Sequence, residues 1–231
     1  MVFLDSHCEV ETDWLQPLLQ RIKLNRRTVA SPVIDNINLN TFRLEPVSSH
    51  LRGGFDWRLE FFWEFLPAHD RAQKLLDPTW PVKTPAVAGG LFAVERRWFE
   101  ELGWYDEGME VWGGENIEMS LRVWMCGGQM EIVPCSKVGH VYKKKTPYNY
   151  PGRGQKTTLG CNNWRVAAVW MEEVVEMYSK LTGSNYNSST CGEIDQRLAL
   201  KQELKCKDFR WFLFNVYPEL QLPGHGDKSF G

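Results

Sequence analysis

The chain has 231 residues, of which 43% are hydrophobic and 24% charged, and its formal net charge is −2. This composition is typical of a globular protein with a sizeable core, built as one large or two small domains. The small net charge gives no support to nucleic-acid binding by bulk electrostatics. No run of about 18 apolar residues occurs and no signal peptide is visible, so the sequence predicts no membrane span.

Residues 1–4 form an apolar run that predicts a strand buried on both faces. Chain termini are usually exposed, so we expect an earlier part of a larger sheet to be missing from this sequence. Asp5 and His7 follow at once and would converge, because residues i and i+2 of an extended segment point to the same side. An oxygen and an imidazole nitrogen at a strand end suit a first-row divalent ion such as Mn²⁺. A polar pair that caps the next helix is the alternative.

The following elements alternate between helix and strand. Residues 14–27 predict a helix, residues 29–37 a strand, and residues 52–57 a turn that leads into the aromatic stretch 61–65. The apolar run 84–94 contains Ala88, Gly89 and Gly90, where glycine permits close backbone approach. Residues 97–102 predict a helical turn.

The segment from Trp112 to Asn116 is the most informative of the chain. Two glycines predict a tight turn, and Glu115 then falls in the first turn of a helix whose apolar face carries Ile117, Leu121 and Trp124. The carboxylate would lie beside the positive end of the helix dipole, where a sugar or phosphate can approach closely. A glycine turn that opens an ordinary packed helix is the alternative.

The last third continues the α/β pattern. Residues 129–133 predict a strand that ends near Pro134, and His140 beyond it is either a third metal ligand or a structural histidine. Residues 165–180 predict a helix, and residues 193–217 a helix followed by an aromatic tail. The mixture of signals, with ligand candidates at strand ends, indicates an α/β nucleotide-binding type of architecture.

Taken together, these motifs resemble the catalytic domain of the polypeptide N-acetylgalactosaminyltransferases, which start mucin-type O-glycosylation. The matching segments run in order across nearly the whole chain, as residues 3–9, 52–57, 83–92, 112–116, 122–124, 132–135, 138–142 and 215–220. The resemblance implies a GT-A fold, a Rossmann-like nucleotide-sugar domain, with residues 1–231 as a single domain. It also implies Mn²⁺ as cofactor, UDP-GalNAc as donor, Ser/Thr of polypeptides as acceptor and retention of configuration.

The resemblance also assigns roles to particular residues. Asp5, His7 and His140 match the metal ligands, and Glu115 and Asn116 match residues of the reaction centre. The remaining matches are Ala88, Gly89 and Gly90 under the sugar, Trp112 over it, Tyr148 in a loop that closes on UDP, and Phe55, Trp57 and Tyr142 in the acceptor-peptide groove. Glu115 would position groups in a same-face mechanism, in which the departing phosphate takes the proton of the acceptor hydroxyl.

The chain departs from the family in its closing loop and in its extent. Residues 143–146 read Lys-Lys-Lys-Thr, where the family usually has an arginine and often a histidine, and lysine cannot form a bidentate phosphate clamp. About a hundred catalytic-domain residues, the membrane anchor and the lectin domain of the family have no counterpart here. We therefore expect this chain alone to be nearly inert.

Six cysteines without a C-x₂-C pair indicate disulfides rather than a zinc site. The resemblance implies a Cys126–Cys206 bridge, a partner for Cys135 outside this sequence, and a location in the Golgi lumen. Whether Cys161 and Cys191 bridge each other stays open, as does use of the Asn187 N-glycosylation sequon.

Two other functions remain open at this point. One is a non-catalytic family member that binds acceptor peptides or partners without turnover. The other is a different Golgi transferase, because β-1,4-galactosyltransferases carry a similar Trp-Gly-Gly-Glu segment. Their metal motif is Asp-x-Asp, however, and Asn116 stands where they have a second acidic residue.

Overall fold

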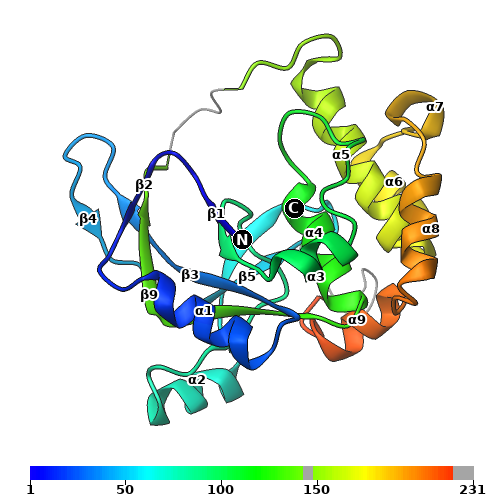
Figure 1. Cartoon of the computed structure of the whole chain (residues 1–231). Coiled ribbons are helices and arrows are strands. Elements are labelled where there is room, and N and C mark those ends of the chain that lie inside the picture. The colour runs from blue at the N-terminus through cyan, green and yellow to red at the C-terminus, as the bar shows by residue number, and fades with distance from the viewer. Residues whose placement is uncertain (143–147, 221–231) are drawn as a thin grey trace.

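The computed structural model describes residues 1–142 and 148–220, and its centre is a mixed β-sheet (Figure 1). Along the sheet the main strands follow one another in the order β1 (Val2–Leu4), β8 (Leu91–Ala93), β3 (Thr28–Ile37), β9 (Gln129–His140) and β2 (Cys8–Val10). β3 and β9 are parallel, whereas β8 is antiparallel to both β1 and β3. β1, β3 and β9 therefore run in the same direction, and their C-terminal ends lie at one edge.

Four further strands complete the β structure of the described residues. β4 (Leu44–Glu45) pairs with β3, and β7 (Val82–Lys83) pairs with β9. β5 (Leu51–Phe55) and β6 (Phe61–Phe65) form a separate antiparallel pair. An isolated bridge between Gly53 and Ala86 ties this pair to the segment that leads into β8.

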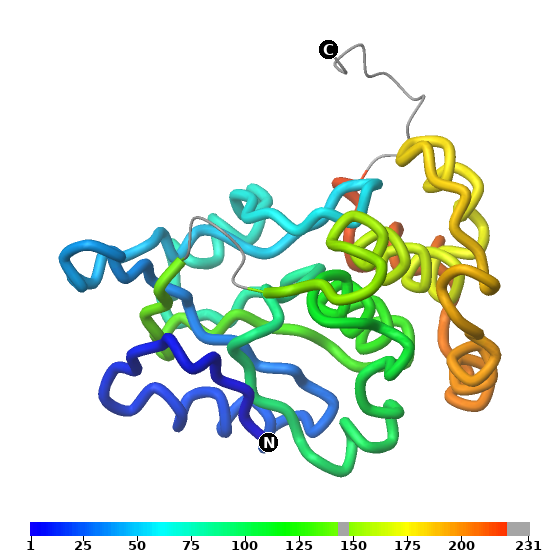
Figure 2. Tube along the Cα trace, turned by 90° about the horizontal axis from the view of Figure 1, so that it is seen from above, coloured from blue at the N-terminus to red at the C-terminus, as the bar shows by residue number. Residues whose placement is uncertain are grey.

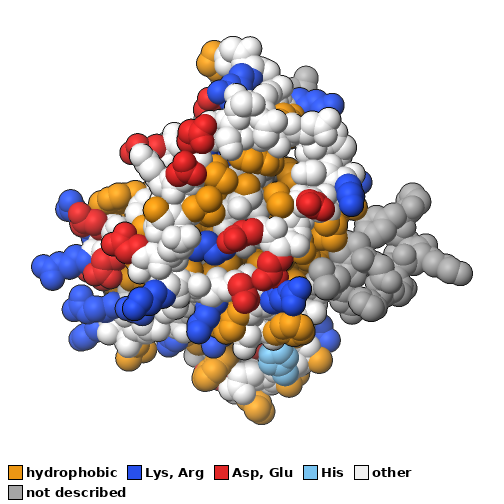
Figure 3. Space-filling view, turned by 90° about the vertical axis from the view of Figure 1, so that its right-hand side faces the viewer, with side chains coloured by type: hydrophobic (Ala, Val, Ile, Leu, Met, Phe, Trp, Pro, Cys, Tyr) orange, Lys and Arg blue, Asp and Glu red, His pale blue; other side chains and the backbone are white. Residues whose placement is uncertain are grey.

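Helices cover the sheet and extend beyond it on one side. α1 (Leu15–Leu24) packs on β3 and β9, while α4 (Glu115–Met125) packs on β9 and on α5 (Gly154–Trp170). The other helices are α2 (Ala68–Leu76), α3 (Arg96–Glu101), the 3-10 turn η1 (Glu172–Val174), α6 (Val175–Thr182), α7 (Ser188–Cys191), α8 (Asp195–Glu203) and α9 (Phe209–Asn215). Seen from above, the N-terminal strands and the C-terminal helices lie on opposite sides of α4 (Figure 2). Acidic and basic side chains are intermixed on the helical side (Figure 3).

Three sequence expectations about strands are wrong. β1 is an edge strand with Val2 42% and Leu4 41% exposed, so it is not buried on both faces. Residues 52–55 belong to β5 instead of a turn, because Gly53 lets this strand approach the backbone oxygen of Ala86. β9 does not end near Pro134 but continues to His140, since the register shift between Pro32 and Val33 of β3 accommodates the proline.

Two helix predictions need correction. The segment 165–180 is divided, because α5 begins earlier and ends at Trp170, before η1 and α6. The segment 193–217, predicted as a helix followed by an aromatic tail, contains two helices, because the aromatic part forms α9; Lys205, with φ of 51°, lies between α8 and α9. The left-handed backbone at that lysine ends α8 and redirects the chain.

Both disulfides raised by the sequence are present, Cys126–Cys206 and Cys161–Cys191. They fix α4 to the segment after α8, and α5 to α7. Cys8 and Cys135 are free thiols in the described structure. No helix within residues 1–142 or 148–220 has the length and hydropathy needed to cross a membrane.

Candidate active site

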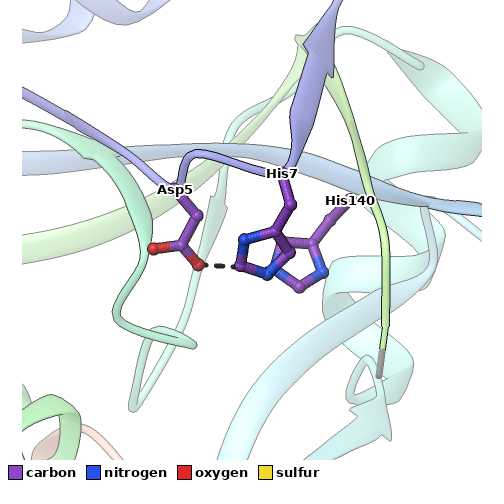
Figure 4. Close-up of side chains that lie close together, drawn as sticks. All are labelled: Asp5, His7 and His140. Atoms are coloured by element: carbon purple, nitrogen blue, oxygen red, sulfur yellow. Dashed lines mark hydrogen bonds and ion pairs between the residues drawn. The ribbon is translucent and has the colours of Figure 1, made fainter. Parts of the chain in front are cut away.

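Asp5, His7 and His140 form a cluster at the sheet edge where β1 and β9 end (Figure 4). One potential ligand atom from each residue lies within 4.8 Å of the other two, and all three residues are half-buried. Asp5 Oδ2 and His140 Nε2 are 3.3 Å apart. One carboxylate and two imidazoles form a donor set suited to a first-row divalent metal.

The backbone brings these three residues together in a way that the sequence only partly predicts. Residues 5–7 form a turn between β1 and β2, so the expected extended Asp-x-His segment is wrong, although the two side chains do converge. β2 then pairs antiparallel with β9, with Cys8 opposite His140. This pairing carries His140 to the cluster across 135 residues of sequence.

Gly89 and Gly90 connect the cluster with the start of α4. A Cβ at Gly90 would lie 2.3 Å from Asp5 Oδ2, and a Cβ at Gly89 would lie 3.0 Å from the Cβ of Asn116. Gly89 also has φ of +103°, which disfavours other residues. Glycine at position 90 therefore lets the backbone approach Asp5 of the cluster, and glycine at position 89 lets it approach Asn116 at the start of α4.

The first turn of α4 presents Glu115 and Asn116, both half-buried. Gly113 N–H donates to Glu115 Oε2 at 2.7 Å, and Asn116 Nδ2 donates to the carbonyl of Val87 at 3.2 Å. Ser120 completes the attachment, because its Oγ accepts from Val87 N–H and donates to the Asn116 carbonyl. The helix start is thus bound to the segment before β8 that carries the two glycines.

A cleft of about 1070 Å³ opens from this helix start. At the start of α4 it is lined by Ala88, Trp112, Gly113, Gly114, Glu115 and Asn116. Phe61, Lys156, Asn163 and Tyr186 also line it. The cleft therefore joins most of the residues that the sequence placed at the sugar site to a longer groove.

The aromatic residues predicted for an acceptor groove do not all face the cleft. Phe55 is fully buried against Phe212, and Trp57 is 8% exposed and packs on Phe209, so neither lines this cleft and their role in an acceptor groove stays a prediction. Alternation along β5 and β6 turns Phe61 into the cleft instead. The aromatic stretch 61–65 was the sequence feature that could have indicated Phe61, but the sequence alone did not show which strand faces the groove.

The other predicted aromatic residues lie near the site. Tyr142 is exposed and its ring is 4.5 Å from that of His140, so it borders the metal cluster. Trp112 and Tyr148 are exposed and stack on each other with ring centroids 6.1 Å apart. The lysine-rich segment 143–146 lies outside the described residues.

Burial and nearby carboxylates perturb two neighbouring groups. Burial, with Asp5 adding to it, raises the pKa of Cys8 to about 11, so this thiol is protonated at neutral pH. Burial, with Glu115 adding to it, also raises the pKa of Tyr105. Within the described residues, Asp5, His7 and His140 are the group whose donor atoms lie close enough together to hold a metal ion.

Comparison with family models gives two partial matches. The model described as "Glycosyl transferase family 2" matches residues 1–103, and that described as "N-terminal domain of galactosyltransferase" matches residues 71–146. The second match covers the Trp112–Glu115 segment, on which the galactosyltransferase alternative depended.

Individual proteins match much more of the chain. It is 51% identical to human polypeptide N-acetylgalactosaminyltransferase 14 over 96% of its own length, and 48% identical to the probable N-acetylgalactosaminyltransferase 6 of Caenorhabditis elegans over 99%. A crystal structure of GalNAc-T7 with UDP, GalNAc and Mn²⁺ superposes with a TM-score of 0.82 at 35% identity and covers 94% of the chain. The predicted GT-A fold is confirmed. The chain spans 40%, 37% and 41% of these three proteins, respectively.

Proposed function

Because the chain belongs to the polypeptide N-acetylgalactosaminyltransferase family, we propose that it forms part of a catalytic domain that transfers GalNAc from UDP-GalNAc to Ser or Thr of polypeptides with retention of configuration. One observation carries this proposal. The Asp5, His7 and His140 cluster and the start of α4 lie at one sheet edge, although Asp5 and Glu115 are 110 residues apart in sequence. Gly89 and Gly90 lie between them and contact Asn116 and Asp5, respectively.

Asp5, His7 and His140 would hold Mn²⁺. The donor set fits this ion, and the missing Cβ at Gly90 leaves room for the Asp5 carboxylate beside the cluster. When bound, the ion would neutralise the diphosphate and stabilise UDP as a leaving group. The Tyr142 ring lies beside that of His140 and would restrict how that imidazole can turn.

The sugar would lie on the backbone of residues 88–90, facing the first turn of α4. The N–H of Gly113 orients Oε2 of Glu115 by a hydrogen bond. The hydrogen bond from Asn116 to the carbonyl of Val87 fixes the helix relative to residues 88–90. Glu115 would orient sugar or acceptor hydroxyl groups, while the departing phosphate takes the acceptor proton. A glycosyl adduct trapped on Glu115 would contradict this same-face mechanism.

The acceptor polypeptide would occupy the cleft that extends from Glu115. Phe61 provides an apolar wall, and Lys156, Asn163 and Tyr186 provide polar groups in its lining. A Ser or Thr hydroxyl would reach the reaction centre beneath Trp112. The two disulfides fit an oxidising compartment, in agreement with our proposal of the Golgi lumen.

The decisive experiment is a transfer assay with UDP-GalNAc, Mn²⁺ and a Thr-rich peptide. It is run on this chain and on a version extended at its N-terminus with the corresponding catalytic-domain residues of a relative. We expect transfer by the extended protein and its loss in Asp5→Ala and His140→Ala. His69→Ala, in which an exposed histidine is removed, is the matched control and should keep full activity.

Metal binding is measured separately on this chain by titration with Mn²⁺ alone. His140→Ala should weaken binding, and His69→Ala should not change it. Peptide binding without transfer by either version would favour the non-catalytic alternative. Absence of both Mn²⁺ binding and transfer would overturn the proposal.

A further inference from the structure

The loop that carries Trp112 is held by one side chain from the neighbouring helix α5. Asn162 is 2% exposed and makes three hydrogen bonds to this loop. Its Oδ1 accepts from the N–H of Glu110 at 3.0 Å, and its Nδ2 donates to the carbonyls of Glu110 at 2.9 Å and Gly113 at 2.8 Å. One buried side-chain amide therefore forms hydrogen bonds with both ends of the 110–113 loop.

The 110–113 loop has an unfavourable backbone conformation. Val111 has φ of +60°, a region that β-branched residues rarely adopt. Gly113 and Gly114 follow with φ of +102° and +86°. Such conformations persist only when the surrounding structure enforces them, and here the hydrogen bonds of Asn162 lie on both sides of Val111.

The loop is also pressed closely against α5. A Cβ at Gly113 would lie 2.3 Å from Leu159 Cδ2, and one at Gly114 would lie 2.7 Å from Asn163 Oδ1. The backbone of Gly113 therefore connects two groups, because its carbonyl accepts from Asn162 while its N–H donates to Glu115 Oε2. A displacement of Gly113 would release the Glu115 carboxylate and Trp112 together.

We propose that Asn162 is a positioning residue of the reaction centre, which holds a strained loop so that Gly113 N–H orients Glu115 and Trp112 stays at the mouth of the cleft. Its importance for turnover rests on the function proposed above for Glu115. The mechanical part, that Asn162 keeps the Gly113–Glu115 hydrogen bond closed, is independent of that function and can be measured without activity.

The test is residue-resolved amide hydrogen exchange on this chain and on Asn162→Asp. This substitution keeps the side-chain volume and the acceptor for Glu110 N–H, but it places an oxygen against two carbonyls. We expect the Gly113 amide to exchange at least about tenfold faster, since two donated hydrogen bonds are lost. Asn215→Asp is the matched control, because Asn215 also donates to a backbone carbonyl, that of Trp211, but is exposed on α9.

Relief of the strain provides a second, independent variant. Val111→Gly removes the cost of the positive φ, so it should slow exchange at Gly113 in the wild-type background and restore most of the protection lost in Asn162→Asp. In an active extended protein, Asn162→Asp should lower kcat more than it changes KM for the peptide. Unchanged Gly113 exchange in a folded Asn162→Asp, or faster exchange in Val111→Gly, would overturn the proposal.

Discussion

Glu115 and Glu118 lie three residues apart on α4, yet their surroundings are opposite. Glu118 is 1% exposed, and its oxygens accept hydrogen bonds from Arg122, Arg197 and Trp170 Nε1. Glu115 is half-buried at the cleft and accepts from Gly113 N–H through Oε2. The hydrogen-bonding capacity of the Glu118 carboxylate is used by partners within the protein, whereas the Glu115 carboxylate can still accept hydrogen bonds from a ligand.

The difference shows how a helix can be held in place by one carboxylate and still present another carboxylate to a cleft. The Glu118 cluster joins α4 to α8 through Arg197 and to α5 through Trp170, so the helix cannot shift along its neighbours. The helix dipole then stabilises the less satisfied carboxylate at the N-terminus. Anchoring through Glu118 therefore permits an incompletely satisfied carboxylate at Glu115, although both lie in the first turn of α4.

The largest expected effect comes from breaking the anchor. Glu118→Gln should lower the free energy of unfolding by about 3–5 kcal/mol, because it leaves the buried guanidinium groups of Arg122 and Arg197 without an opposite charge. Chemical denaturation measures this change. Glu101→Gln, at an exposed position, is the control and should stay within about 0.5 kcal/mol of wild type. Equal stability of the two variants would show that Glu118 does not anchor α4.

The second prediction concerns the open carboxylate. In an extended protein that transfers GalNAc, Glu115→Gln should reduce kcat by about 10²–10³, the size seen when one preorganised group of a transition state is removed. The free energy of unfolding should change by less than about 1 kcal/mol, since a glutamine oxygen can still accept from Gly113 N–H. A loss of stability as large as that of Glu118→Gln would show that Glu115 is also an anchor.

Sequence patterns revealed the surroundings of Glu115 much better than those of Glu118. Gly113 and Gly114 before an amphipathic run located the helix start, and the resemblance to a known family assigned Glu115 and Asn116 to the reaction centre. The partners of Glu118 were not predictable, because Arg197 is 79 residues away and belongs to a helix whose bounds were predicted wrongly. Local motifs fix local turns, whereas buried ion pairs depend on how distant helices pack.

The same limit applies to the rest of the site. Asp5, His7 and His140 were predicted as one cluster, and the structure brings them together, but the turn and the β2–β9 pairing that do so were not foreseen. Phe55 was placed in a groove although it is buried in the core. Alternation along a strand shows that two faces exist, and only tertiary packing decides which of them is covered.

The smallest expected effect is the pH dependence of the anchor. Burial alone would raise the pKa of Glu118, but Arg122 and Arg197 more than offset it, and the net pKa is lowered. A lowered pKa in the folded state adds stability that is fully present above the ordinary glutamate pKa of about 4.3 and is lost as the pH falls through the folded-state value.

The stability difference between wild type and Glu118→Gln should therefore be constant from about pH 8 to pH 5 and should narrow below the unfolded-state pKa of about 4.3. Denaturant titrations of both proteins at several pH values measure this difference, in which contributions from other carboxylates such as Asp77 cancel. Glu101→Gln should show no such narrowing. A difference that stays constant to pH 3 would mean that the pKa of Glu118 is the same in the folded and unfolded states, so that Arg122 and Arg197 only balance the effect of burial. A difference that widens as the pH falls from about 6 towards 4.3 would mean that burial dominates over the two arginines and raises the folded-state pKa, and the anchor would then be weaker than its hydrogen bonds indicate.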